Sequence, residues 1–460
     1  MNSNGNSGGD QAGHLRPALE LPSIAGLRPD FIWGVSTSSF QIEGATREDG
    51  RGPSIWDVYC QNGEVKNHDT GDIACDHYHR YREDVALMKR LGVQAYRFSV
   101  AWPRVLPQGR GAANEPGLAF YDRLVDELLA AGIEPWLCLY HWDLPQALED
   151  LGGWMNRESA SWFADYAELV ATRFGDRVKR FATFNEPSIF ILFSRSLGKR
   201  DRSSEDNLHR TIHHVNLAHG AAVDLLRGRV LGASIGCIHN YQPCWPSSKS
   251  EADAAAASRL STYWNNAFPD PQCRGEYPSL MQPAIEPYIQ PGDMARICRP
   301  VDWFGLNHYS PVYVKAQQTL MLGFDFGDKP PGVPLTPIEW PINPEAFGET
   351  LRIVHESYRL PIYVLENGFG NFDKPDQAGA VIDPERIEFL RAYIAAMNAA
   401  AASGVDIRGY FIWSLLDNFE WASGYSIRFG LTYVDYQSLR RIPKSSFNWY
   451  ADLIKTAHQR

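Results

Sequence analysis

The chain lacks any excess of positive charge. It has 44 Lys and Arg residues against 54 Asp and Glu residues, which gives a formal net charge of −10. Proteins that bind nucleic acid or an anionic membrane surface carry a basic patch that contacts phosphate groups. We therefore expect neither a nucleic-acid partner nor a membrane partner.

The sequence is also poor in the patterns that bind metals or build disulfide frameworks. Its 7 cysteines are an odd number, lie far apart and include no C-x-x-C pair, which argues against a disulfide framework and against a structural zinc site. The histidines at positions 77, 79, 213 and 214 have no matched set of cysteines or carboxylates, so we expect no metal site. Reduced thiols indicate a cytoplasmic protein.

Long hydrophobic runs are missing as well. No apolar stretch approaches the ~18 residues that a membrane-spanning helix needs. Residues 1–25 are polar and rich in Gly, Asn and Ser, without the apolar segment of a signal peptide. We expect them to form a disordered tail, followed by a single domain over residues 26–460.

The rest of the chain alternates between strand and helix patterns. Eight apolar runs predict strands at residues 31–38, 95–102, 135–142, 180–186, 232–239, 303–309, 362–366 and 408–415. Helical patterns between and after them predict helices at residues 78–91, 116–131, 158–174, 207–228, 251–266, 345–358, 384–403 and 445–458. The first is followed by Gly92, a residue favoured at helix C-termini. Repeated strand–helix units predict an α/β fold with parallel strands, and eight of them predict a (β/α)8 TIM barrel. The alternative, an open doubly wound sheet, normally has a Gly-rich phosphate turn, and no G-x-G-x-x-G follows any strand here.

Two of the expected strands end in a glutamate. In RFATFNEP an apolar strand ends in Asn185 and Glu186, before Pro187, and IYVLENGFG passes from an apolar run directly to Glu366. A carboxylate in such a place is unfavourable unless chemistry uses it. A pair of carboxylates is what cleavage of a glycosidic bond requires. Their separation distinguishes a retaining from an inverting route, and the residues alone leave both routes open.

Polar and aromatic side chains also lie at the ends of the other strands. The loops after the strands form the active face of a barrel, so we expect these side chains to meet. Seven strands contribute, and besides the two glutamates the candidates are Gln41, Glu43, Arg97, His141, Trp142, Asn185, Asn307, Tyr309, Trp413, Asp417, Glu420 and Trp421. Arg97 is a permanent cation that holds a neighbouring carboxylate ionised, which suits a nucleophile, and Tyr309 is placed to donate to the same carboxylate.

With these residues identified, the sequence resembles glycoside hydrolase family 1, the β-glucosidase and β-galactosidase family. The resemblance covers nearly the whole chain, from about Asp30 onward, and its motifs occur in family order. They are FIWGVSTSSFQIEGA, YRFSVAWPRVLP, YHWDLPQAL, TFNEP, NHYSP, IYVLENGFG and WSLLDNFEWASGYSIRFGLTYVDY.

This resemblance implies a retaining double displacement, with Glu366 as the nucleophile and Glu186 as the acid/base, and no cofactor or metal. The implied substrate is a small-molecule β-glycoside with a terminal β-D-glucosyl residue, or a β-D-galactosyl or β-D-fucosyl residue. Intact Glu420 favours an unphosphorylated hexose, and a glutamate rather than a glutamine at position 186 favours O-glycosides. A transglycosylase that uses the same residues is an alternative. A non-catalytic sugar-binding barrel and a metal-dependent barrel hydrolase are further alternatives.

The resemblance also implies the residues that hold the sugar. Those expected to contact substrate are Gln41, His141, Trp142, Asn185, Asn307, Tyr309, Trp340, Trp413, Glu420, Trp421 and Phe429. Among them, Trp413 matches a stacking platform for the non-reducing sugar, Phe429 lies near its 6-position, and Trp340 walls the leaving-group side. Arg97 and Tyr309 match the residues that support the nucleophile.

The chain departs from the family just after Glu186. Between Ser188 and Asn207 the family's Gly-rich loop is replaced by a segment that contains Lys199, Arg200 and Arg202. We expect this segment to open the site to a bulky or non-sugar leaving group. The sequence leaves open the physiological leaving group and whether the chain forms a homo-oligomer.

Overall fold

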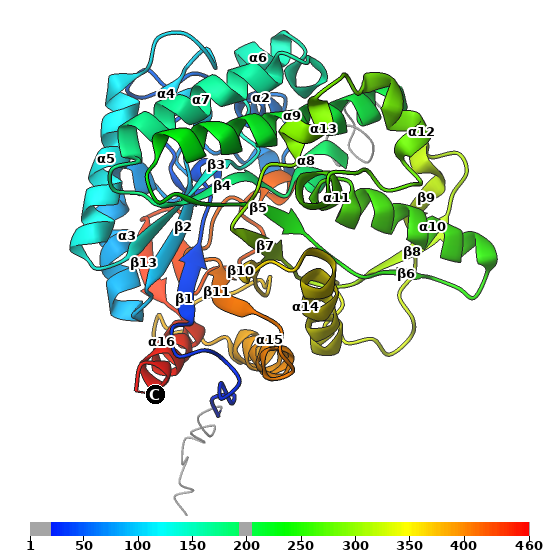
Figure 1. The fold of residues 1–460 in the computed structure, drawn as a ribbon. Helices are drawn as coiled ribbons and strands as arrows, with labels where there is room; N and C mark the ends of the chain where they lie inside the picture. The colour runs from blue at the N-terminus through cyan, green and yellow to red at the C-terminus, as the bar shows by residue number, and fades with distance from the viewer. Residues whose placement is uncertain (1–19, 193–204, 460) are drawn as a thin grey trace, which may run out of the picture.

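A closed barrel of parallel strands lies at the centre of the molecule, surrounded by helices (Figure 1). The computed structural model describes residues 20–192 and 205–459. The barrel strands follow the order β1-β11-β10-β7-β5-β4-β3-β2 and confirm the predicted (β/α)8 barrel. Their bounds are β1 Ile32–Ser36, β2 Ala95–Ser99, β3 Glu134–Tyr140, β4 Arg180–Asn185, β5 Ser234–Asn240, β7 Trp303–Asn307, β10 Ile362–Asn367 and β11 Ile407–Trp413.

The long helices agree with the expected segments to within a few residues. Their bounds are α3 His77–Leu91, α5 Glu115–Ala130, α7 Ser159–Phe174, α9 Glu205–Arg229, α10 Glu251–Ser261, α14 Pro344–Tyr358, α15 Pro384–Ala402 and α16 Ser445–Ala457. Gly92 ends α3 in the left-handed conformation, with a φ of 82°. The segment expected to be helical as far as Asn266 differs, because α10 ends at Ser261 and a π-helical turn, Thr262–Asn266, follows.

Shorter helices and strands lie in the loops. The short helices are α1 Ser39–Ile42, α2 Ile55–Gln61, α4 Trp102–Val105, α6 Gln146–Asp150, α8 Pro187–Ile191, α11 Pro269–Arg274, α12 Gln282–Ile285 and α13 Asp293–Ile297. Strands β6 Cys244–Pro246, β8 Val312–Ala316 and β9 Phe324–Phe326 form a small sheet beside α10, and β12 Thr432–Asp435 pairs with β13 Arg440–Pro443. The sequence did not predict these strands, four of which have only three or four residues, too few to show a period.

Large side chains fill the inside of the barrel, and glycines on neighbouring strands make room for them. A Cβ atom on Gly236 would lie 2.4 Å from the Trp303 ring, and one on Gly34 would lie 2.4 Å from Phe411. Trp136, Trp303 and Phe411 belong to one buried cluster inside the barrel. The interior is therefore a packed core, as in other barrels of this type, and not a pore.

The expected tail and the altered loop fall mostly outside the described part of the chain. Residues 1–19 and 193–204 are not described, and the second range contains Lys199, Arg200 and Arg202. Within the expected tail, Ile24 is buried in the main core. Over the described residues, no helix combines the length and apolar character needed to cross a bilayer.

A buried ionic network joins the loops that follow β10 and β11. The Lys444 ammonium lies 2.6 Å from an oxygen of Asp373 and 2.7 Å from an oxygen of Asp417. Arg386 also pairs with Asp373, at 2.6 Å, and donates to the backbone carbonyl of Phe369 at 3.2 Å. Phe369 and Asp373 follow β10, whereas Asp417 follows β11. Lys444 therefore connects two loops of the active face.

We expect the substitution Lys444→Met to lower the free energy of unfolding by about 3–5 kcal/mol, because removing one partner leaves buried charges uncompensated. Urea-induced unfolding at neutral pH measures the change. Lys455→Met, at an exposed position of α16, is the matched control. A loss below about 1 kcal/mol, the value typical of an exposed ion pair, would contradict the role of Lys444 as a buried bridge.

Candidate active site

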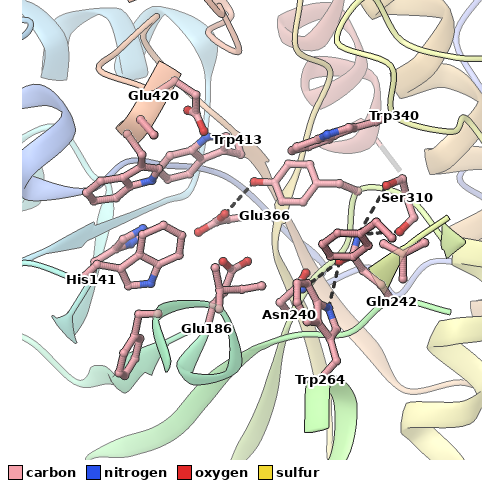
Figure 2. A pocket seen from close by; sticks show the side chains of 18 of the residues that line it. His141, Glu186, Asn240, Gln242, Trp264, Ser310, Trp340, Glu366, Trp413 and Glu420 are labelled. Atoms are coloured by element: carbon pink, nitrogen blue, oxygen red, sulfur yellow. Dashed lines mark hydrogen bonds between the residues drawn. The ribbon is translucent and has the colours of Figure 1, made fainter. Parts of the chain in front are cut away.

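A cavity of about 930 Å³ lies at the ends of the barrel strands and contains both candidate glutamates. Figure 2 shows Glu186, which directly follows β4, and Glu366, near the end of β10, facing the same space. The structure places ten of the expected site residues in the cavity wall, and they are His141, Trp142, Glu186, Tyr309, Trp340, Glu366, Trp413, Glu420, Trp421 and Phe429.

Four other expected residues lie behind this wall and contact it. Asn307 donates to Glu186 at 2.8 Å, and Gln41 lies 3.5 Å from an oxygen of Glu420. Arg97 contacts Glu366 at 2.5 Å. Asn185 contacts His141 at 3.2 Å.

Two strand-end acids that were expected to join the site do not line the cavity. Glu43 is buried in an ion pair with Arg104 at 2.8 Å and accepts a hydrogen bond from Tyr121 at 2.6 Å. Asp417 belongs to the ionic network with Lys444. Both acids therefore pair with buried cations. Their position after a strand is the same as that of the acids in the cavity wall, so the sequence could not separate the two roles.

Glu366 is buried at the end of β10 and is held by a cation and a phenol. Arg97 Nη1 lies 2.5 Å from its Oε1, and the Tyr309 hydroxyl donates to its Oε2 at 2.7 Å. The register of the barrel places Glu366 beside Asn307 on β7. Burial raises the pKa of Glu366, and Arg97 and Tyr309 oppose this rise.

Among the described residues, no cation forms an ion pair with Glu186. It is buried, and Asn307 Nδ2 donates to its Oε1 at 2.8 Å. Burial, followed by the negative charge of Glu366, raises the pKa of Glu186 well above its ordinary value. Both pKa values are raised, but among the described residues only Glu366 has a paired cation, so Glu366 is the more easily ionised of the two carboxyl groups.

A third acid and an imidazole occupy one side of the carboxylate pair. His141 stacks against Trp413 with ring centroids 5.7 Å apart. Burial, reinforced by the charge of Arg97, lowers the pKa of His141 well below its usual value, so the imidazole is neutral. Burial and the charge of Glu366 raise the pKa of Glu420 to about 8. This side of the cavity therefore offers polar groups together with aromatic faces, a combination that fits a polyhydroxylated ring.

Four residues of the cavity wall adopt left-handed backbone conformations, which are unfavourable for residues other than glycine. The φ angles are 78° for Trp142, 51° for Glu186, 64° for Glu339 and 48° for Trp421. Each such residue costs roughly 1–3 kcal/mol, and such positions cluster at functional sites.

The other side of the cavity contains residues that the sequence did not indicate. They are Asn240, Gln242, Trp264 and Ser310. Asn240 is the last residue of β5, whereas the expected strand stopped one residue earlier, and β5 was the strand without a candidate. A correct strand end would have identified Asn240. Trp264 lies in the π-helical turn, for which the sequence offers no signal.

Within the described ranges, no three His, Cys, Asp or Glu side chains are arranged to hold a metal ion.

A barrel with paired carboxyl groups in its cavity is typical of a glycoside hydrolase, and comparisons with known proteins find the same class. A model of the family described as Glycosyl hydrolase family 1 matches residues 24–459. The β-glucosidase A of Thermotoga maritima is 43% identical over 434 residues, covering 92% of this chain and 97% of that protein. The chain belongs to glycosyl hydrolase family 1, and the resemblance seen in its motifs is confirmed.

Two further proteins are similar to this chain over most of its length. The bifunctional β-D-glucosidase/β-D-fucosidase of Bifidobacterium breve is 41% identical over 453 residues, covering 92% of this chain and 97% of that protein. A solved structure of the family 1 β-glucosidase from Thermotoga maritima has a TM-score of 0.88 at 41% identity, covering 94% of this chain and 98% of that one.

We expect Glu366→Gln to lower the pKa of Glu186. The substitution removes the negative charge that disfavours ionisation of Glu186, so its carboxylate becomes easier to form. Titration of the glutamate side-chain carbons by ¹³C NMR measures the shift, with Glu345→Gln, an exposed position on α14, as the control. An unchanged pKa of Glu186 in the Glu366 variant would mean that the two carboxyl groups are not coupled.

Proposed function

We propose that this protein is a retaining β-glucosidase that removes terminal, non-reducing β-D-glucosyl residues from small-molecule β-glycosides. The observation that carries the proposal is the unequal environment of the two buried carboxyl groups. Glu366 is paired with Arg97 at 2.5 Å, whereas Glu186 has a pKa raised well above its ordinary value. One group is therefore ready to attack while the other is ready to donate a proton.

In the first step, an ionised oxygen of Glu366 attacks the anomeric carbon as the bond to the leaving-group oxygen breaks. Glu186 transfers its proton to that oxygen, and the sugar remains joined to Glu366 as an ester. Arg97 and Tyr309 hold the attacking carboxylate in position.

Formation of the ester prepares the second step. An esterified Glu366 has no negative charge, so the charge that raises the pKa of Glu186 is gone. Glu186, now ionised, removes a proton from a water molecule, whose oxygen attacks the anomeric carbon. The bond to Glu366 breaks, the carboxylate is restored and the sugar leaves with its β configuration retained.

The sugar itself is proposed to occupy the side of the cavity that contains His141 and Glu420. Trp413 supplies the apolar platform, and Phe429 lies near the 6-position. The residues proposed to hold its hydroxyl groups are Gln41, His141, Trp142, Asn185, Asn307, Tyr309, Glu420 and Trp421. Trp340, which is 37% exposed, is proposed to wall the leaving-group side.

Activity on β-D-fucosyl and β-D-galactosyl residues is proposed as a secondary property, and the bifunctional relative from Bifidobacterium breve supports the first of these. Transglycosylation uses the same intermediate, with an alcohol in place of water. Each of the 7 cysteines of the chain is a free thiol, which supports our proposal of a cytoplasmic location.

We expect Glu366→Ala to abolish release of p-nitrophenol from p-nitrophenyl β-D-glucoside, because no nucleophile remains. Added azide is small enough to take its place and should restore release, with the α-glucosyl azide as product. Product configuration by NMR is the measurement. A β-configured azide, or an alanine variant as active as the unmodified protein, would contradict the assignment of Glu366.

Glu186→Gln should slow cleavage most for substrates whose leaving group must be protonated as it departs. We expect kcat/KM for phenyl β-D-glucoside to fall by roughly 10²–10⁴-fold, the usual contribution of general acid catalysis. For a dinitrophenyl glucoside, whose leaving group departs without a proton, the fall in kcat/KM should be much smaller. Equal losses on both substrates would argue that Glu186 is not the acid. Glu345→Gln again serves as the exposed control.

A further inference from the structure

Beyond the carboxylate pair, the cavity has a second polar wall. In Figure 2, Glu186 and Glu366 lie between the side that holds His141 and the side that holds Gln242. Trp340, which is 37% exposed, borders this second side. On the proposed function, this is the half of the cavity that receives the leaving group.

The side-chain amide of Gln242 is held in one orientation by two neighbours. The Trp264 indole donates to Gln242 Oε1 at 3.0 Å, and Gln242 Nε2 donates to the backbone carbonyl of Ser310 at 2.6 Å. An indole N–H only donates and a carbonyl only accepts, so the amide cannot be reversed without losing both bonds. Asn265 also holds the backbone of Gln242, since it accepts from the Gln242 N–H at 3.0 Å and donates to the Gln242 carbonyl at 2.8 Å.

This orientation determines that of Asn240. Its Nδ2 donates to Gln242 Oε1 at 3.0 Å, an oxygen that only accepts. Asn240 must therefore present Oδ1, a hydrogen-bond acceptor, on the other side of its amide. Among the described residues no donor reaches this oxygen, and Asn240 lines the cavity.

We propose that Gln242 is a positioning residue that makes Asn240 an acceptor for a hydroxyl group of the leaving group. The preferred substrates are then β-glucosides whose leaving group has such a hydroxyl, either a second sugar or a hydroxylated aromatic ring. Trp340, across the cavity from Asn240 in Figure 2, supplies an apolar face for the rest of the leaving group. The inference rests on the proposed function and adds the class of leaving group.

The test compares kcat/KM for phenyl β-D-glucoside with the values for its ortho-, meta- and para-hydroxyphenyl counterparts and for cellobiose. All of these substrates form the same glucosyl-enzyme, so differences in kcat/KM between them arise only from the first step. The unmodified protein should prefer cellobiose or at least one hydroxyphenyl glucoside over the phenyl compound by about tenfold, the usual value of one good hydrogen bond.

Substitutions at Gln242 and Asn240 distinguish a positioning role of Gln242 from a general loss of activity. In Gln242→Met, the side-chain amide of Asn240 is free to reverse. The ratio of kcat/KM for the hydroxylated substrate to kcat/KM for phenyl β-D-glucoside should therefore fall to near one, and the same is expected for Asn240→Leu. Gln242→Glu, buried and protonated, reproduces the acceptor and donor of the glutamine and should keep the preference. Gln437→Met, at an exposed position, is the matched control. If these variants lose the preference for cellobiose, the hydroxyl group that Asn240 contacts belongs to a sugar. If they lose the preference for a hydroxyphenyl glucoside, it belongs to an aromatic ring.

The outcomes that overturn the inference differ from those that overturn the proposed function. Hydrolysis of every substrate without preference, or a preference that survives both Gln242→Met and Asn240→Leu, overturns the role of Gln242 and Asn240 alone. Failure of the unmodified protein to hydrolyse any β-glucoside overturns both. If Gln242→Met does not fold, Asn240→Leu and Gln242→Glu decide the question.

Discussion

The site depends on the pairing of Arg97 with Glu366. The two side chains are 2.5 Å apart and almost fully buried. Burial alone would favour the protonated form of both carboxyl groups. Arg97 pairs with Glu366 and favours its ionised form, and among the described residues no cation pairs with Glu186. The proposed roles of Glu366 as nucleophile and Glu186 as acid rest on this difference.

The barrel holds Arg97 beside Glu366. Arg97 is on β2 and Glu366 is on β10, two strands that are not neighbours in the barrel. Their contact therefore requires the closed barrel with its packed interior, where Trp136 and Trp303 fill the space below the site. Outside the barrel, Lys444 ties the loop after β10 to the loop after β11, which leads to Glu420.

Much of this arrangement could be predicted from the sequence, because each barrel strand is a short apolar run and the catalytic candidates directly follow such runs. Less local features escaped prediction. Two strands of the small sheet, β6 and β9, have three residues each and are too short to show a pattern. The sequence of the π-helical turn around Trp264 has the pattern of a continued α10. Glu43 and Asp417 have the same position in the pattern as the site residues, yet their partners Arg104 and Lys444 are distant in sequence. Their burial in ion pairs depends on tertiary packing alone.

One measurement tests the coupling of the two carboxyl groups most directly. A glucoside with a fluorinated sugar that forms the glycosyl-enzyme but releases it slowly would trap Glu366 as its uncharged ester. The pKa of Glu186 is then measured by ¹³C NMR in the free and the trapped protein. Our account predicts a fall of at least about one pKa unit on trapping, because the charge that raised it is gone. A pKa of Glu186 that is unchanged or higher in the trapped protein would contradict it.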